Sequence, residues 1–117
     1  MRHHNANRKF GRPANQRRAL LQGLAVSLVR DEKIMTTEAR AKELRPIIEK
    51  LVTKARTSTL ANRRLIITRL GNQETTAKKL IDVIAPKYVD QAGGYTRITK
   101  LPARQGDASP RAIIEFV

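Results

Sequence analysis

The sequence predicts an α+β fold of two layers, in which helices pack on a small mixed three-stranded sheet. Apolar residues recur with helical spacing in four segments of residues 15–84. A short run rich in β-branched residues separates the first two of these segments, and the period changes to two in the last quarter of the chain. The predicted order is therefore helix, strand, three helices and two strands.

The length of 117 residues suits one domain with a small core. We expect residues 1–14 to form a basic arm, because they carry Arg and Lys without any acid and lack apolar periodicity. Residues 15–117 are expected to form a single globular domain. Polar residues interrupt the run Leu20–Val29, and no window approaches about 20 apolar residues, so we expect neither an export signal nor a membrane span.

The first helix is expected to follow Asn15, whose side chain can cap it. Its apolar stripe has the spacing of one helix face and consists of Leu20, Leu21, Leu24, Ala25, Leu28 and Val29. The segment "EKIMTT" at residues 32–37 is short and β-branched, which predicts a brief strand.

The second helix is predicted to start after Thr37, whose hydroxyl can cap it, with Glu38 at the positive end of the helix dipole. Pro46 lies inside this helix and cannot donate a backbone hydrogen bond, so we expect a kink. The buried stripe keeps its phase past the proline and consists of Ala41, Leu44, Ile48, Leu51, Val52 and Ala55.

Two shorter helices are predicted next. The third is capped by Ser58 or Thr59 and ends at the pair Gly71-Asn72. The fourth covers residues 73–84, and Pro86 limits its extension.

The last two predicted strands are Tyr95–Leu101 and Arg111–Val117, joined by the loop "PARQGDASP". If the isoleucine of the first strand points into the core, Tyr95 and Arg97 face outward together. An aromatic ring beside a guanidinium suits base stacking and phosphate contact. The alternative is that Tyr95 packs on the final strand.

The charge points to a polyanionic partner. There are 24 Lys and Arg against 10 Asp and Glu, for a formal net charge of +14 and a sequence pI of about 11.3. The chain has no cysteine, and its two histidines, His3 and His4, both lie in the predicted arm. Gly93-Gly94 is not followed by the lysine and helix of a phosphate-binding loop. We therefore expect no enzyme, no cofactor, no metal and no small-molecule substrate.

Basic residues are spread over the start, the middle and the end of the chain, which favours a protein embedded among several RNA segments over one that reads a single groove. The lysines of the predicted helices lie near glutamates, so we interpret them as a solvated face. They are Lys42, Lys50, Lys54, Lys78 and Lys79.

Several stretches together resemble the bacterial large-subunit ribosomal protein family seventeen. They are "MRH", "RRALLQGLAVSLVRDEKIMTTEARAKELRPIIEKLVTKA", "ANRRL" and "AGGYTRI", in this order, and the resemblance extends over essentially the whole chain. It implies a two-layer α+β fold and incorporation into the large ribosomal subunit in the cytoplasm. It also implies direct binding to 23S rRNA near the exit of the peptide tunnel, and contact with neighbouring ribosomal proteins, large-subunit protein thirty-two above all.

From the residues and the resemblance together we predict sixteen RNA-binding positions. They are Arg2, His3, Arg8, Lys9, Arg12, Arg17, Arg18, Arg63, Arg64, Gly93, Gly94, Tyr95, Thr96, Arg97, Lys100 and Arg104. The rival interpretation is a free basic nucleic-acid-binding regulator or nucleoid protein. We find no apolar seam for a homo-oligomer and no aromatic belt for a membrane surface.

Overall fold

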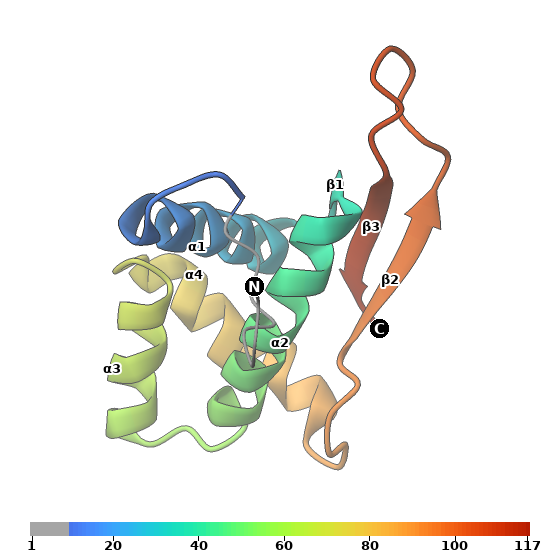
Figure 1. Cartoon of the computed structure of the whole chain (residues 1–117). Coiled ribbons are helices and arrows are strands. Elements are labelled where there is room, and N and C mark those ends of the chain that lie inside the picture. Colours follow the sequence, from blue (N-terminus) through green and yellow to red (C-terminus); the bar gives the residue numbers. More distant parts are fainter. Residues whose placement is uncertain (1–9) are drawn as a thin grey trace, which may run out of the picture.

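The computed structural model describes residues 10–117 (Figure 1). Its helices are α1 (Ala14–Asp31), α2 (Glu38–Ala55), α3 (Leu60–Arg69) and α4 (Glu74–Lys79), and α4 continues into a π-helical turn η1 (Leu80–Ile84) and a 3-10 turn η2 (Ala85–Tyr88). Its strands are β1 (Lys33–Thr37), β2 (Thr96–Leu101) and β3 (Arg111–Phe116). The α+β class and the predicted order of elements are confirmed. The candidate residues Arg2, His3, Arg8 and Lys9 lie outside the described residues.

The sheet has β3 in the centre, in the order β1-β3-β2, and both outer strands run antiparallel to β3. The expectation of a mixed sheet is therefore wrong in that detail. The register places Ile34 and Ile98 on either side of Ile114, so three isoleucines form one row across the sheet. Ile114 is fully buried. This row is the centre of the inner face.

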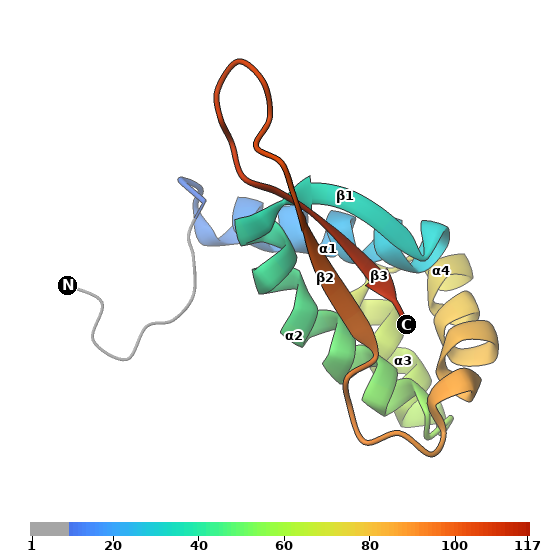
Figure 2. The ribbon, with the colours of Figure 1, turned by 90° about the vertical axis from the view of Figure 1, so that its right-hand side faces the viewer.

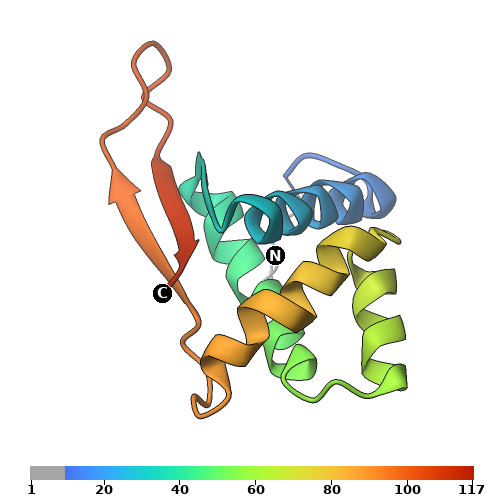
Figure 3. The same cartoon turned by 180° about the vertical axis from the view of Figure 1, so that it is seen from behind.

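All four helices lie on one side of the sheet, as Figures 1 and 2 show. Helix α2 packs directly on the inner face and contacts all three strands. Helix α3 lies farthest from the sheet, which is clearest from behind (Figure 3). The hairpin loop between β2 and β3 projects beyond the helices (Figure 2). No helix of residues 10–117 covers the outer face of the sheet (Figures 1 and 2).

Two of the predicted helix caps are confirmed and one is wrong. The hydroxyl of Thr37 accepts a hydrogen bond from the Arg40 amide at the start of α2, and Thr59 does the same for Asn62 at the start of α3. Helix α1, however, begins at Ala14, before the predicted cap at Asn15. Pro13 occupies the cap position with φ −59° and ψ 160°, an extended conformation, and α1 starts after it without a side-chain cap.

Prolines act differently in the two helical regions that contain them. Helix α2 is continuous from Glu38 to Ala55 with Pro46 inside it. At the other site the α-helical pattern changes to the turn η1 before Pro86, and the amide of Ala85 bonds to the carbonyl of Leu80. A π-helical turn shifts the hydrogen-bond pattern by one residue just ahead of a proline that has no N–H to donate.

The core confirms the predicted stripe of α2 completely, because all six of its residues are buried. In α1 only the second half of the stripe is buried, at Ala25, Leu28 and Val29. Leu20, Leu21 and Leu24 are half-buried. The first half of α1 therefore packs less closely, and this is where the groove described below opens.

Candidate nucleic-acid interface

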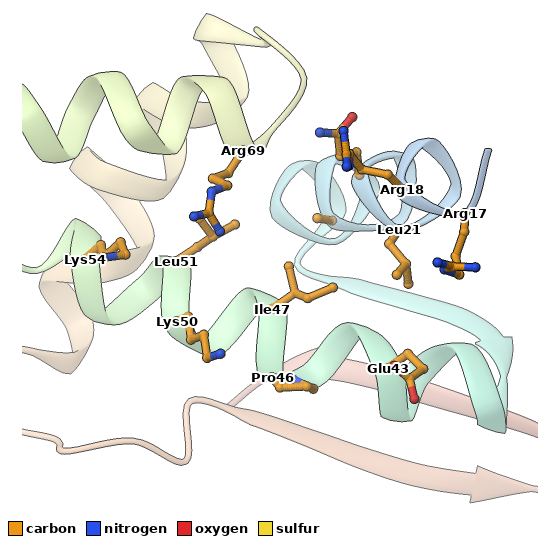
Figure 4. Close-up of a pocket in the computed structure, with 12 residues that line it drawn as sticks. Arg17, Arg18, Leu21, Glu43, Pro46, Ile47, Lys50, Leu51, Lys54 and Arg69 are labelled. Carbon is orange, nitrogen blue, oxygen red and sulfur yellow. The ribbon is translucent and has the colours of Figure 1, made fainter. Parts of the chain in front are cut away.

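A groove with a volume of about 680 Å³ lies between the first half of α1, one side of α2 and the end of α3 (Figure 4). Its floor is apolar and consists of Leu21, Ala25, Pro46, Ile47 and Leu51. The side chains of Leu21 and Ile47 point toward one another from α1 and α2 (Figure 4). The groove thus offers apolar surface between helices that do not close over it.

Five cations surround this floor. Arg17 and Arg18 come from the first turns of α1, Lys50 and Lys54 from α2, and Arg69 from the last turn of α3. Because residues four apart share a helix face, Lys50 and Lys54 lie on the same side of α2. The remaining lining residues are Gln22 and one acid, Glu43.

Most of these cations have no partner within residues 10–117. No hydrogen bond or ion pair there involves the side chains of Arg18, Lys50, Lys54 or Arg69. Arg17 donates only to a main-chain oxygen, the carbonyl of Arg12, at 3.3 Å. Like charges gathered at a concave apolar surface produce a strong local field, which attracts an anion. The arrangement can therefore bind a polyanion that also presents apolar surface.

Two cations of the sheet lie beside a carboxylate instead. Arg97 faces outward as predicted, but its Nη2 lies 2.7 Å from Glu115 Oε1, and the two residues are cross-strand partners. Lys33 approaches the same carboxylate at 3.9 Å from β1. The hydrogen bond from Arg97 holds the pKa of Glu115 below its usual value. In this row of the outer face, one carboxylate offsets one of the two positive charges.

The other two sheet-region candidates are paired as well. The amine of Lys100 lies 3.5 Å from Glu38 at the start of α2. In the hairpin loop the guanidinium of Arg104 donates to Asp107, with Nε 3.1 Å from Oδ1. This contact lowers the pKa of Asp107 to about 2, and the amide of Ser109 adds to the effect.

The two predicted arginines of α3 differ from each other. Arg63 donates to the Ser58 hydroxyl at 3.0 Å and lies 3.6 Å from a carboxylate oxygen of Asp82. Arg64 is exposed and has no partner among residues 10–117. Only Arg64 of this pair is available without breaking a contact.

The glycine pair before β2 folds its segment onto α2. Gly93 and Gly94 have φ angles of +116° and +67°, which favour glycine. The Gly94 amide donates to one carboxylate oxygen of Glu49 at 3.2 Å, and the Thr96 hydroxyl donates to the other at 2.7 Å. Thr96 is consequently buried, and its hydroxyl already has a partner.

The prediction that Tyr95 faces outward is wrong, because the side chain is buried and its ring packs against Tyr88. Its side chain is 1% exposed, and its ring centroid lies 5.3 Å from that of Tyr88. The alternation of a strand does not apply to it, because β2 begins only at the next residue, after the turn made by the glycines. A buried ring cannot stack on a nucleotide base.

Arg56 holds this tyrosine and the connection before it. Its Nη1 donates to the Tyr95 hydroxyl at 2.7 Å and to the Gln91 carbonyl, and its Nη2 donates to the Val89 carbonyl at 3.1 Å. The hydrogen bonds that the Tyr95 hydroxyl shares with Thr53 and Arg56 lower the pKa of Tyr95. Arg56 is therefore a structural cation, although it belongs to the basic residues spread along the sequence.

The structure brings Arg17 and Arg18 together with three groove cations that were not among the predicted sites. Lys50 and Lys54 were interpreted as a solvated face, and Arg69 was not singled out from the sequence. The available signal was the spacing of Lys50 and Lys54 beside Ile47 and Leu51, a basic row adjoining an apolar row on one helix.

Comparison with known proteins assigns the chain to a family. The profile of the family described as ribosomal protein L17 matches residues 20–117. The chain belongs to this family. A "Large ribosomal subunit protein bL17" of Thermomicrobium roseum is 54% identical over 117 residues, covering 100% of this chain and 99% of the relative. Proteins of the same name are 51% identical in Sphingopyxis alaskensis, covering 100% of this chain and 84% of the relative, and 50% identical in Dictyoglomus thermophilum, covering 100% of both.

Membership in the L17 family confirms the resemblance drawn from the sequence motifs. Within residues 10–117, no helix has the length and apolar character needed to span a membrane, and no three His, Cys, Asp or Glu residues come together as metal ligands.

Proposed function

We propose that this protein is a structural constituent of the large ribosomal subunit, without a catalytic step, that binds 23S rRNA in the cytoplasm and holds rRNA segments together near the exit of the peptide tunnel. Family membership and the names of the relatives support the ribosomal assignment. The observation that carries the RNA-binding assignment is the groove, where four of the five rim cations have no partner within residues 10–117.

Binding proceeds by charge neutralisation. Each rim cation that reaches a phosphate releases a condensed counterion, and log K falls by roughly 0.7 to 0.9 for each such contact per tenfold rise in salt. Arg17, Arg18, Lys50, Lys54 and Arg69 present these charges from three helices. Because the three helices are fixed by one core, phosphates from separate RNA segments are held in one arrangement.

The remaining predicted sites differ in the contacts that they must give up to bind a phosphate. Arg64 has no partner within residues 10–117 to give up for a phosphate, and Arg12 is half-buried with a bond to a main-chain oxygen. Arg63, Arg97, Lys100 and Arg104 must each exchange a carboxylate for a phosphate. The sites Arg2, His3, Arg8 and Lys9, and the backbone of Gly93 and Gly94, complete the proposed interface.

Neighbouring ribosomal proteins are the second class of partner that we propose, with large-subunit protein thirty-two as the specific candidate. The outer face of the sheet, which no helix of residues 10–117 covers, supports a protein contact. It presents Met35, which is 61% exposed, next to the half-buried Ile113 in the same cross-strand row. Apolar side chains flanked by paired charges resemble the composition of a protein interface.

The test compares two sets of lysines and arginines that carry equal charge. The groove variant combines Lys50→Gln, Lys54→Gln and Arg69→Gln. The control combines Lys33→Gln, Lys42→Gln and Lys87→Gln, whose amines all lie near carboxylates. Filter binding of the full chain to transcribed 23S rRNA is measured from 50 to 400 mM salt.

We expect the groove variant to reduce the salt slope by about two units and the control to reduce it by less than one. Equal losses in both variants contradict a localised site. Equally tight binding of duplex DNA, tested by competition, contradicts the ribosomal proposal and supports a free nucleic-acid-binding regulator.

A further inference from the structure

We propose that the groove between α1, α2 and α3 holds a single nucleotide that is unstacked from its RNA, with the base on the apolar floor and the flanking phosphates on the rim cations. This inference rests on the RNA-binding function proposed above and adds the kind of RNA structure that the site accepts: a bulged or looped nucleotide rather than a continuous duplex.

The first argument is the composition of the floor. A surface that contacts only phosphates needs cations and no apolar cavity. Here Pro46 is exposed, and Leu21 and Ile47 are half-buried between the helices that carry the cations. A nucleobase is the apolar part of RNA that covers such a floor, because its faces carry no hydrogen-bonding groups.

The second argument is size. A volume of about 680 Å³ lies in the range of roughly 300 to 1,000 Å³ that is typical of small-ligand sites. The stacked bases of an A-form RNA helix cannot reach the floor of the protein groove. The major groove of such a helix is deep and narrow, and the RNA backbone lies on the outside. A nucleotide that leaves the stack can enter.

The third argument is the chemistry of the rim. Three of the five cations are arginines, whose planar guanidinium groups both stack on a base and bind phosphate in a bidentate manner. Arg17 and Arg18 stand on one side of the groove and Arg69 reaches toward α2 from the other (Figure 4). Phosphates on both sides of the extruded base therefore meet cations.

The fourth argument concerns sequence preference. Gln22 is the one uncharged polar residue of the lining, and the floor itself offers no side-chain donor or acceptor. The groove therefore holds a base by its faces and tolerates any of the four bases. Because the site does not depend on a particular sequence, simple RNA hairpins are decisive probes.

The experiment uses the full chain and three RNA hairpins. The first is fully paired, the second carries one bulged adenosine, and the third carries an abasic residue at the bulge, so the second and third have equal charge. We expect the bulged adenosine to bind about tenfold more tightly than the abasic bulge, with the same salt slope. A 2-aminopurine at the bulge is expected to change its fluorescence on binding.

The matched variants are Leu21→Ser and Leu20→Ser. Both leucines are half-buried on α1 and neither belongs to the apolar cluster of the core, but only Leu21 lines the groove. We expect Leu21→Ser to reduce the tenfold preference to about twofold and Leu20→Ser to retain it. Circular dichroism shows whether both variants keep their helices.

The outcomes separate the two proposals. Equal affinity for the adenosine and abasic hairpins, unchanged by Leu21→Ser, overturns the nucleotide site and leaves the groove to an acidic segment of a neighbouring protein, while RNA binding itself stands. If none of the three hairpins nor 23S rRNA binds, the proposed function itself fails.

Discussion

The helical groove and the sheet carry similar numbers of basic side chains, but they differ in what surrounds those side chains. At the groove, Lys50, Lys54 and Arg69 have no partner within residues 10–117. On the sheet and its hairpin, Arg97 and Arg104 each donate to a carboxylate. A paired cation must lose one contact to gain another, whereas an unpaired one only exchanges its counterions. Accessible charge, and not the number of cations, distinguishes the two regions.

Reversing charge at the groove is expected to have the largest effect. Lys50→Glu combined with Lys54→Glu replaces two attractions to phosphate by two repulsions, and we expect the affinity for 23S rRNA to fall about 100-fold at 100 mM salt. Filter binding measures the loss. The control is Lys42→Glu with Lys87→Glu, the same charge change at two paired lysines. A loss as large in the control means that net charge alone governs binding.

The second largest effect is expected on stability, from the loss of Arg56, which connects the sheet region to the helices. Arg56→Ala removes hydrogen bonds to Val89, Gln91 and Tyr95, and it leaves the buried tyrosine hydroxyl with fewer partners. We expect the free energy of unfolding to fall by about 2 to 3 kcal/mol. Urea denaturation followed by circular dichroism measures it.

The control for Arg56 is Arg64→Ala, which removes an exposed arginine without a partner within residues 10–117 and is expected to leave stability within about 0.5 kcal/mol of the parent. If Arg56→Ala unfolds at the same urea concentration as Arg64→Ala, then the arginine does not hold the connection.

Local sequence patterns predicted the helices and their caps well, for a physical reason. The stripe of α2 and the caps Thr37 and Thr59 depend on residues three or four positions apart, so a single sequence contains the whole pattern. The order of the strands in the sheet was harder to predict from the sequence. Pairing between β1 and β3 joins residues about eighty positions apart, and nothing local indicates that β1 lies beside β3 or runs antiparallel to it.

The candidate site was harder to predict because its components come from distant segments. Arg18, Lys50 and Arg69 lie on three helices, and the groove exists only after those helices pack. The same limit explains the error at Tyr95. Its burial depends on Arg56, thirty-nine residues earlier in the chain, while the alternation seen in the sequence suggested an outward ring.

A smaller effect on RNA affinity is expected when a cation of the sheet loses its carboxylate partner. Glu115→Gln removes the partner of Arg97 and reduces the contact with Lys33. We expect affinity for 23S rRNA to rise about threefold, since exposed ion pairs contribute little and only one arginine is released. The control is Glu74→Gln, which removes an exposed acid that has no partner within residues 10–117. An equal rise in both variants shows that the pairing of Arg97 is irrelevant.

The smallest effect is a dependence of stability on acid pH. The pKa of Glu115 is lowered by its hydrogen bond from Arg97, and that of Asp107 is lowered to about 2 by Arg104. A carboxyl whose pKa is lower in the folded state stabilises the fold above its unfolded pKa, and this contribution disappears as the pH falls through the folded pKa. The relevant window therefore extends from about pH 4.5 down to about pH 2. We expect Tm to fall across it, and to fall less steeply in the variant that combines Asp107→Asn with Glu115→Gln. Identical slopes of Tm against pH in the parent and the variant mean that these pairs do not persist in solution, which makes Arg97 and Arg104 as available to phosphate as the groove cations.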